Sequence, residues 1–319
     1  MRQWVSLEAT PENRAIGISA VEDRARQTSG VLLLDKPIGM SSNAAVQKAR
    51  RLFDRVKAGH TGTLDPLASG LLPICLGEAT KFSHALLDAD KAYLATARLG
   101  WRSSTGDSEG ELYRVGAPDF DQVTLDRAVE ALTGEIEQVP PMYSAVKVNG
   151  QPLYALARKG LNVERKPRTV HINRLEVKAV CADSVSISVS CSKGTYVRVL
   201  AEELGQRLGC GAYLTALRRV LIGTITIDDA VGLDDLESLD PPARSALLKP
   251  VDFMLSSLPP VSLSLDDGVR LCHGLAIRGT GAGAGLLVRV YREDGRFLGT
   301  AEVDDEGVLK PKRLVSTAF

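Results

Sequence analysis

The sequence predicts an α+β fold, with one large domain followed by a small C-terminal β domain. Strand-like and helix-like segments alternate irregularly along the 319 residues, without a repeat of fixed period. The longest β signal lies over residues 169–191, where Val185, Ile187, Val189 and Cys191 occupy every second position. Together these patterns favour an α+β sheet over a doubly wound one.

The elements of the large domain follow in order. The apolar run at 31–35 predicts a short strand, and Ser41, Ser42 and Asn43 predict the start of a helix with apolar residues at helical spacing. The later predictions are a strand over 91–99, a helix over 125–133 closed by Gly134, the β region over 169–191, and a helix over 195–208 ended by Gly209.

An inserted arm is expected near residues 140–168. Asn149-Gly150 is a hairpin-type turn, a short helix follows it, and the segment ends in a basic run. This arm is the natural candidate to clasp a bound nucleic-acid strand.

The last segment, residues 259–319, is expected to be a small β domain. Pro259 and Pro260 separate it from an acidic stretch. Its glycine-rich segment at 279–285 leads into a strand-like run and lacks both the dinucleotide and the P-loop spacing, so we interpret it as a β connection.

Several classes are disfavoured. No run approaches the roughly 18 apolar residues of a membrane span, and residues 1–29 mix charges without the apolar run of a signal peptide. We expect these 29 residues to form a poorly ordered extension and the protein to be cytoplasmic. The five cysteines include no CxxC pair and the four histidines are far apart, which predicts reduced, buried thiols and no metal site.

The charges are balanced in number but not in position. The chain has 39 basic and 39 acidic residues, yet cations gather at 48–57 and 158–174 and acids at 228–240. Either basic run alone is typical of a solvated helix face. Both together favour a nucleic-acid partner, because affinity for phosphates follows local cations. The second run contains Arg158, Arg165 and Arg168.

Asp65 is the candidate reaction centre. It is the only acidic residue of the segment 59–73, and Pro66 after it disfavours helical geometry while Gly59, Gly62 and Gly70 permit turns. The segment therefore predicts a fixed loop that presents one carboxylate. An equally weighted alternative is that Asp65 caps a short helix beginning at Pro66.

Five ordered motifs resemble those of the TruB-type tRNA pseudouridine synthases. They read DKPIGMSSN at 35–43, GHTGTLDPLASG at 59–70, KAY at 91–93, SKGTYVR at 192–198 and LTALRR at 214–219. The resemblance runs from about residue 30 to residue 251. The C-terminal part is only loosely similar to a small RNA-binding PUA-like domain.

This resemblance implies a fold, an activity and a partner. The fold is a mixed, mainly antiparallel sheet flanked by helices, with a central RNA-binding cleft. The activity is isomerisation of uridine to pseudouridine at position 55 in the T arm of tRNA. It implies no cofactor and no obligatory protein partner, and we expect a monomer.

The resemblance also implies the site residues. Asp65 takes the place of the catalytic aspartate, Tyr93 of the active-site tyrosine, Arg198 of the aspartate's partner and Leu217 of a pocket-lining residue. His60, Lys36, Lys193 and Tyr196 match motif positions and are expected to contact RNA. The residues alone leave plainer alternatives open: Tyr93 as an ordinary strand aromatic, Leu217 as a core residue, His60 as a loop histidine bonded to backbone, and the two lysines as solvated side chains. A helix near 195 would splay Tyr196 from Arg198, so we expect the first residues there to remain extended.

The chemistry suits these residue types. The reaction breaks the bond from uracil N1 to ribose C1′ and rejoins the base through C5, which a carboxylate nucleophile can assist in both directions. Attack at C1′, a glycal route and attack at C6 all remain open.

Two other functions remain as hypotheses. One is a base-exchanging, glycosidase-like enzyme, which is disfavoured because no second carboxylate lies in the motifs. The other is a noncatalytic tRNA-folding factor.

Overall fold

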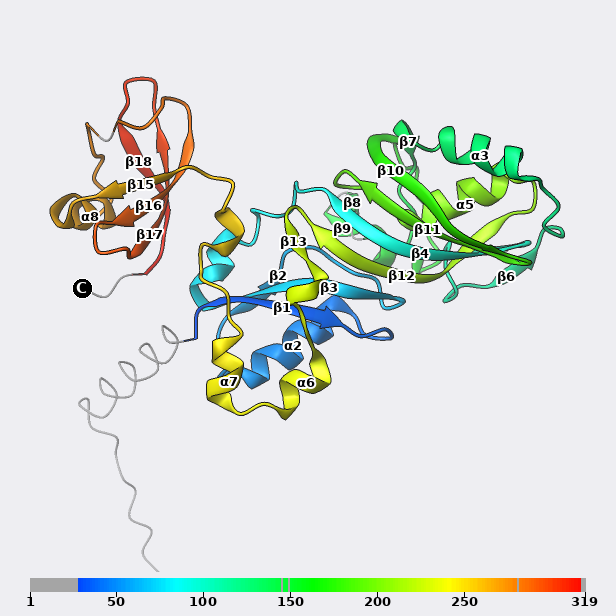
Figure 1. Ribbon diagram of the computed structural model, residues 1–319, viewed down its shortest axis with the longest axis horizontal. Helices are drawn as coiled ribbons and strands as arrows, with labels where there is room; N and C mark the ends of the chain where they lie inside the picture. Colours follow the sequence, from blue (N-terminus) through cyan, green and yellow to red (C-terminus); the bar gives the residue numbers. More distant parts are fainter. Residues whose placement is uncertain (1–27, 145, 149, 280, 317–319) are drawn as a thin grey trace, which may run out of the picture.

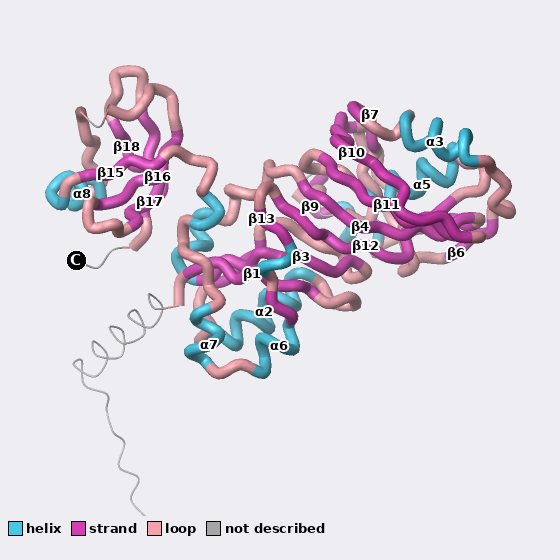
Figure 2. Tube along the Cα trace, in the orientation of Figure 1, coloured by secondary structure: helices cyan, strands magenta, loops and turns pink. Residues whose placement is uncertain are grey.

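The large sheet and a second, smaller sheet are drawn in Figure 1, and Figure 2 separates strands from helices. The computed structural model describes residues 28–144, 146–148, 150–279 and 281–316. Residues 1–27 of the expected extension lie outside the described residues. The two that are described, Thr28 and Ser29, adjoin the first strand, and Ser29 Oγ accepts a hydrogen bond from the backbone of Glu78 at 3.1 Å.

The large sheet contains ten strands in the order β14-β1-β3-β12-β4-β11-β10-β7, with β2 beside β3 and β13 beside β12. Two pairings, β1 with β14 and β12 with β3, are parallel, and the others are antiparallel. The prediction of a mixed, mainly antiparallel sheet is therefore confirmed. The strands are β1 Gly30–Lys36, β2 Ala58–His60, β3 Ala68–Leu76, β4 Lys91–Leu99, β7 Gly134–Gln138, β10 Arg168–Cys181, β11 Ser184–Cys191, β12 Ala212–Ile222, β13 Ile225–Thr226 and β14 Val231–Gly232.

A short parallel pairing joins the two halves of this sheet. Leu217, Arg218 and Arg219 of β12 lie opposite residues 68–70 of β3. Gly70 has φ of 101°, and a Cβ there would lie 2.3 Å from the carbonyl oxygen of Arg219. Only glycine permits this approach, so the seam between the halves depends on that residue.

Helices cover each half of the sheet (Figure 1). Helix α2, Ser42–Leu52, buries Ala45, Val46 and Ala49 in one cluster with residues of β1 and β3. Helices α3, Gln122–Glu130, and α5, Val197–Arg207, bury apolar residues in a second cluster with β4, β11 and β12. The four alternating residues of 185–191 are at most 1% exposed, as their spacing predicts.

Short elements connect these parts. They are η1 Gly77–Phe82, β5 Trp101–Ser103, β6 Leu112–Arg114, η2 Ile227–Asp229, α6 Leu233–Ser238, α7 Pro241–Ala246 and η3 Phe253–Leu255.

Helix boundaries differ from the predicted ones at two places. Helix α3 begins at Gln122 and not at 125, because Asp121 accepts a hydrogen bond from the Thr124 backbone at 2.8 Å and caps it. It ends at Glu130, and Gly134 is the first residue of β7. Helix α5 begins at Val197 and not at 195, with its preceding residue extended. The cap of α2 is as predicted, since Ser41 accepts from the Ala44 backbone.

The arm contains the predicted hairpin and short helix. Strands β8, Lys147–Val148, and β9, Gln151–Pro152, pair around Gly150, whose φ is 81°, and α4, Leu153–Ala157, follows. Asn149 lies outside the described residues. Function as a clasp stays a prediction.

The C-terminal strands form the predicted small β domain, separate from the large sheet (Figure 1). Its order is β15-β16-β17-β18, with helix α8 packed against it. The elements are β15 Pro260–Leu263, α8 Leu265–Cys272, β16 Leu287–Arg292, β17 Phe297–Val303 and β18 Leu309–Leu314. The segment 279–285, apart from Thr280, which is not described, is a connection that leads into β16.

The thiols are free, and three of the five are buried. Cys181, at the end of β10, is exposed and Cys272 is partly exposed, so the prediction of buried thiols is wrong for these two. Among the helices that the structure describes, none combines the length and apolarity needed to cross a membrane.

Candidate active site

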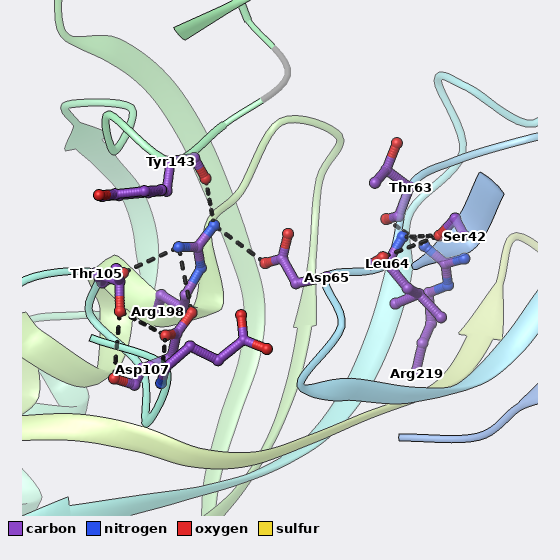
Figure 3. Close-up of polar contacts among 10 residues, drawn as sticks. Ser42, Thr63, Leu64, Asp65, Thr105, Asp107, Tyr143, Arg198 and Arg219 are labelled. Atoms are coloured by element: carbon purple, nitrogen blue, oxygen red, sulfur yellow. Dashed lines mark hydrogen bonds and ion pairs between the residues drawn. The ribbon is translucent and has the colours of Figure 1, made fainter. Parts of the chain in front are cut away.

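Asp65 lies in a fixed loop between β2 and β3. The Ala68 backbone donates to the Asp65 carbonyl at 3.0 Å, and β3 starts at once, so no helix begins at Pro66 and the capping alternative is wrong. The Ser42 hydroxyl holds the residue before the carboxylate by two hydrogen bonds to the Leu64 backbone (Figure 3). The Gly39 backbone donates to the Pro66 carbonyl at 2.7 Å and holds the other side.

Arg198 holds the Asp65 carboxylate from the opposite half of the sheet (Figure 3). Its Nη2 lies 3.0 Å from Asp65 Oδ2 and also donates to the Tyr143 carbonyl at 2.7 Å. Its Nη1 donates to the Thr105 carbonyl at 2.9 Å. Arg198 thus pairs with Asp65, as expected. Its backbone, however, lies in the first turn of α5, because the extended conformation that we expected ends at Tyr196.

A second carboxylate, Asp107, supports Arg198 from behind. Its Oδ2 lies 3.4 Å from Arg198 Nη1, and its side chain is 3% exposed. The Thr105 hydroxyl donates to Asp107 at 2.5 Å, and the Glu109 backbone donates to it at 3.1 Å. Asp107 belongs to none of the five motifs, so no sequence pattern pointed to it.

These groups line a pocket of about 230 Å³. Asp65 is the one carboxylate among its described lining residues. The lining comprises Gly62, Thr63, Leu64, Asp65, Lys91, Tyr93, Ser144, Ser192, Gly194, Thr195, Tyr196, Val197, Arg198, Leu217 and Arg219. The pocket thus brings together five of the predicted site residues, namely Asp65, Tyr93, Arg198, Tyr196 and Leu217.

Arg219 forms the wall beneath the Asp65 loop. It is 1% exposed, and its guanidinium donates to the carbonyls of Leu71 at 2.8 Å, Gly62 at 3.1 Å and Thr63 at 3.4 Å. It is the cross-strand partner of Tyr93 in the pairing of β12 with β4. Arg219 lies in the motif at 214–219, but the sequence alone does not show which arginine of that motif is buried.

The electrostatics of the pocket are set by burial. Burial raises the pKa of Asp65 above its ordinary value; the Arg198 guanidinium opposes this, and the Asp107 carboxylate adds to it. Arg198 therefore fixes the direction of a carboxylate whose acidity burial has weakened. Burial also raises the pKa of the Tyr93 hydroxyl, against the influence of Arg219.

Lys36 and His60 lie beside the pocket without lining it. Lys36 is fully buried, and its Nζ donates to the carbonyls of Met40 at 2.6 Å and Pro37 at 2.9 Å, so the solvated alternative is wrong. Burial lowers its pKa to about 8. His60 Nδ1 accepts from the Gly62 backbone at 3.3 Å, which is the backbone-bonded alternative, and burial lowers its pKa.

Three further predicted residues are placed as follows. Lys193 is exposed, with its Nζ 2.7 Å from Asp88 Oδ1. Tyr196 caps α5, and its backbone is held by Gln138 of β7 at 3.0 Å. Leu217 both lines the pocket and packs against the two main clusters, so the core and pocket interpretations hold together.

None of the arginines of the second basic run lines this pocket, although Arg168 Nη1 lies 4.0 Å from the position that a Cβ of Gly194, a lining residue, would take. Arg158 stands over the Tyr154 ring at 5.6 Å, Arg165 donates to the Pro140 carbonyl at 3.1 Å, and Arg168 is exposed at the start of β10. In the first run, Arg50 is used internally, donating to the carbonyl that follows α2 at residue 55. Among the described residues, no group of three or more His, Cys, Asp or Glu side chains is arranged to hold a metal ion.

Comparison with known families matches almost all of the chain beyond residue 50. Residues 50–197 match "TruB family pseudouridylate synthase (N terminal domain)". Residues 198–256 match "tRNA pseudouridylate synthase B C-terminal domain", and residues 259–315 match "Pseudouridine synthase II TruB, C-terminal".

Curated relatives are similar over most of their length. The "tRNA pseudouridine synthase B" of Aromatoleum aromaticum is 55% identical over 292 residues, which are 92% of this chain and 94% of that protein. The protein of the same name from Dechloromonas aromatica is 50% identical over 92% of this chain and 97% of its own.

Solved structures share the fold. A chain in the "Crystal Structure of a Cbf5-Nop10-Gar1 Complex" superposes with a TM-score of 0.68 and 26% identity, covering 93% of this chain and 86% of that one. A chain of the "archaeal box H/ACA sRNP Nop10-Cbf5 complex" gives a TM-score of 0.67 at 23% identity, covering 92% and 88%.

Proposed function

Since the chain belongs to the TruB family of pseudouridylate synthases and is an isomerase that forms pseudouridine in tRNA, we propose that it acts on uridine 55 of the T arm with Asp65 as nucleophile. The observation that carries the proposal is the ion pair of Asp65 with Arg198, at 3.0 Å, inside a pocket that also contains Tyr93. A single carboxylate, fixed in direction and reachable from solvent, is what the reaction requires.

Asp65 has the exposure and support for a nucleophile. Its side chain is 38% exposed, whereas that of Arg198 is 5% exposed. The arginine is thus buried with its partner groups and presents the carboxylate toward the opening. In each of the three routes, by attack at C1′, through a glycal or by attack at C6, the carboxylate acts as an ionised base or nucleophile.

Tyr93 and Leu217 would receive the target base. The uridine lies within a folded RNA loop and must be flipped into the pocket, at a cost of a few kcal/mol. The Tyr93 ring offers a face for stacking and Leu217 an apolar contact. Tyr196, at the rim, would contact the flanking nucleotides together with His60.

Cations outside the pocket would hold the RNA backbone. We assign this role to Arg158, Arg165 and Arg168 around the arm and to Lys193 at the other rim. Their exposed positions support it for Arg158, Arg168 and Lys193. The buried Nζ of Lys36 is occupied by two carbonyls, so Lys36 would act by holding the loop that contacts Pro66.

We also propose a domain division, an oligomeric state and a cellular location for the protein. Residues 30–251 would form the catalytic domain and 259–319 the RNA-binding accessory domain, with the arm near 140–168 as clasp. We propose a monomer that acts in the cytoplasm, where its tRNA substrate is found. Sedimentation of the protein with and without a T-arm stem-loop tests the monomer: a dimer with two RNA molecules would contradict it.

Release of tritium from C5 of uridine tests the function. tRNA labelled at C5 should lose the label to water while the strand remains intact, because C5 becomes bonded to ribose. Asp65→Asn should abolish release and leave RNA binding in place, and Asp183→Asn, which alters an exposed carboxylate paired with Arg98, should behave as wild type. Turnover retained in Asp65→Asn would rule out Asp65 as the nucleophile.

The same assay separates the two alternatives. Free uracil as product would favour a glycosidase-like enzyme, although Asp107 is held behind Arg198 and does not line the pocket. Binding without release of label by the wild type would favour a noncatalytic RNA-folding factor. A T-arm whose uridine 55 is replaced by cytidine, with other uridines labelled, should release no tritium if position 55 is the target.

A further inference from the structure

The charges that line the Asp65 pocket are unevenly compensated. The Arg198 guanidinium lies against two carboxylates, Asp65 and Asp107. Lys91 donates to three backbone carbonyls, of residues 86, 87 and 89, and is influenced by nearby carboxylates, those of Asp88 and Asp90. Arg219 is different, because its hydrogen-bond partners among the described residues are neutral carbonyls, and the charged side chains whose pKa it lowers, Lys36 and Lys91, are cations like itself.

Arg219 is a buried cation without a counter-ion in the part of the chain that the structure describes. Its hydrogen-bond partners there are the three carbonyls of Leu71, Gly62 and Thr63. Keeping such a charge away from water is costly when no carboxylate is present to offset it. The pocket wall therefore contains a positive charge that an anion in the pocket would stabilise.

The reaction supplies such an anion. The base must leave the ribose, turn, and rejoin through C5. In attack at C1′ and in the glycal route, both electrons of the N1–C1′ bond stay on the base when that bond breaks, and the base becomes a uracil anion. The anion lasts until C5 bonds to C1′ with one of its electron pairs, after which the C5 proton is lost and N1 gains a proton. In attack at C6 the same electrons also stay on the base, which remains bonded to Asp65 meanwhile.

The geometry points to Arg219 as the group that stabilises the detached uracil anion from the pocket wall; this rests on the proposed function. Arg219 is 1% exposed and lines the pocket that contains Asp65. Because its guanidinium is fixed by three carbonyls in a poorly solvated wall, its charge acts on an anion in the pocket with little screening by water.

The arrangement of the strands supports this assignment. Tyr93 and Arg219 are directly opposed residues of β4 and β12, and both line the pocket. The same guanidinium holds Gly62 and Thr63, immediately before Leu64 and Asp65. Arg219 therefore connects the loop that carries Asp65 to the strand position opposite Tyr93, within the lining of one pocket.

The test compares leaving groups of different anion stability. One T-arm RNA contains uridine at position 55 and the other 5-fluorouridine, whose electron-withdrawing fluorine stabilises the detached anion. Loss of the N1-linked nucleoside in single turnover, read by mass spectrometry of digests, is measured for wild type, Arg219→Met and Arg219→Lys. Thermal unfolding and RNA affinity are measured for each.

Loss of the charge should matter most for the poorer leaving group. We expect Arg219→Met to slow turnover of uridine by roughly 100-fold, the usual cost of removing a group that stabilises a developing anion. Turnover of 5-fluorouridine should slow by only about tenfold. Arg219→Lys keeps the charge, so the ratio of the two rates should stay within about threefold of wild type even where both rates fall.

Equal slowing of both substrates in Arg219→Met would overturn the inference and leave Arg219 a structural residue. The same holds if Arg219→Lys changes the ratio as much as methionine does, a comparison that remains available if the methionine variant fails to fold. Arg218→Met is the matched control: it removes the neighbouring charge, paired with Asp35, and should leave the ratio unchanged. A wild type inactive on both RNAs would instead refute the proposed function.

Discussion

The Ser42 hydroxyl and the Leu64 backbone form a closed pair of hydrogen bonds. Ser42 Oγ donates to the Leu64 carbonyl at 2.9 Å and accepts from the Leu64 amide at 2.7 Å, although the residues are 22 positions apart. Both are buried. The first residue of α2 therefore fixes the backbone immediately before Asp65.

Ser42→Ala should reduce catalysis more than it reduces RNA binding. The change leaves both backbone groups of Leu64 without their partner, at a cost of about 1–3 kcal/mol for a buried unsatisfied group, and lets the Asp65 loop shift. We expect kcat to fall at least tenfold with KM little changed. Ser41→Ala is the control, since Ser41 caps the same helix from an exposed position and does not touch the loop; equal loss of kcat in both would contradict the assignment.

Asp107→Asn should lower activity although Asp107 does not line the pocket. The variant keeps the size and most hydrogen bonds but removes one of the two carboxylates at Arg198. Because the Arg198 guanidinium and the Asp65 carboxylate can then reorient together, we expect the single-turnover rate to fall roughly 10²-fold. A fall of this size is typical when a reacting group is misplaced. Asp126→Asn, on the exposed side of α3, is a matched control that should show no loss.

Asp65→Asn should unfold at a higher temperature than wild type at pH 7. The native pKa of Asp65 is raised, mainly by burial, so the native state binds the proton more tightly than the unfolded state and wild-type stability falls as pH rises through that window. The variant has no such group. The difference in unfolding temperature between Asp65→Asn and wild type should therefore become smaller as pH falls toward 4, and thermal unfolding across this range measures it. A difference that grows on acidification would show that the pKa of Asp65 is not raised in the native state.

Asp88→Asn should strengthen RNA binding at low salt. The exposed Asp88 carboxylate pairs with Lys193, 2.7 Å away, and would compete with an RNA phosphate for it. Lys193→Ala should weaken binding and reduce the slope of log K against log salt by about 1. Because the pair is exposed, neither change should alter stability by more than about 1 kcal/mol. If Asp88→Asn tightens binding equally in the Lys193→Ala background, the competition does not exist.

The sequence was sufficient for the strands near 31–35, 91–99 and 169–191 and for the loop that presents the carboxylate, whereas β3 and β12 were not predicted. Alternation at 185–191 predicted a buried face correctly, and Pro66 with its flanking glycines predicted a fixed loop. Arg198 was paired correctly with Asp65 through the resemblance, but its helical geometry was missed, because one turn of a helix and an extended strand place a long arginine equally well. Asp107 and Arg219 were missed for a different reason: their roles arise from burial and from partners more than 80 residues away, which local pattern does not encode.

The short parallel seam between β3 and β12 has a consequence for how activity is lost. Asp65 is positioned by the first half of the sheet, whereas Tyr93 and Arg198 belong to the second half. Gly70 allows the two halves to meet beside Arg219. Neither half alone contains a complete pocket. Catalysis is therefore a cooperative property of the whole sheet: a chain in which either half has opened has no residual turnover, and the rate of isomerisation reports the population of fully assembled molecules.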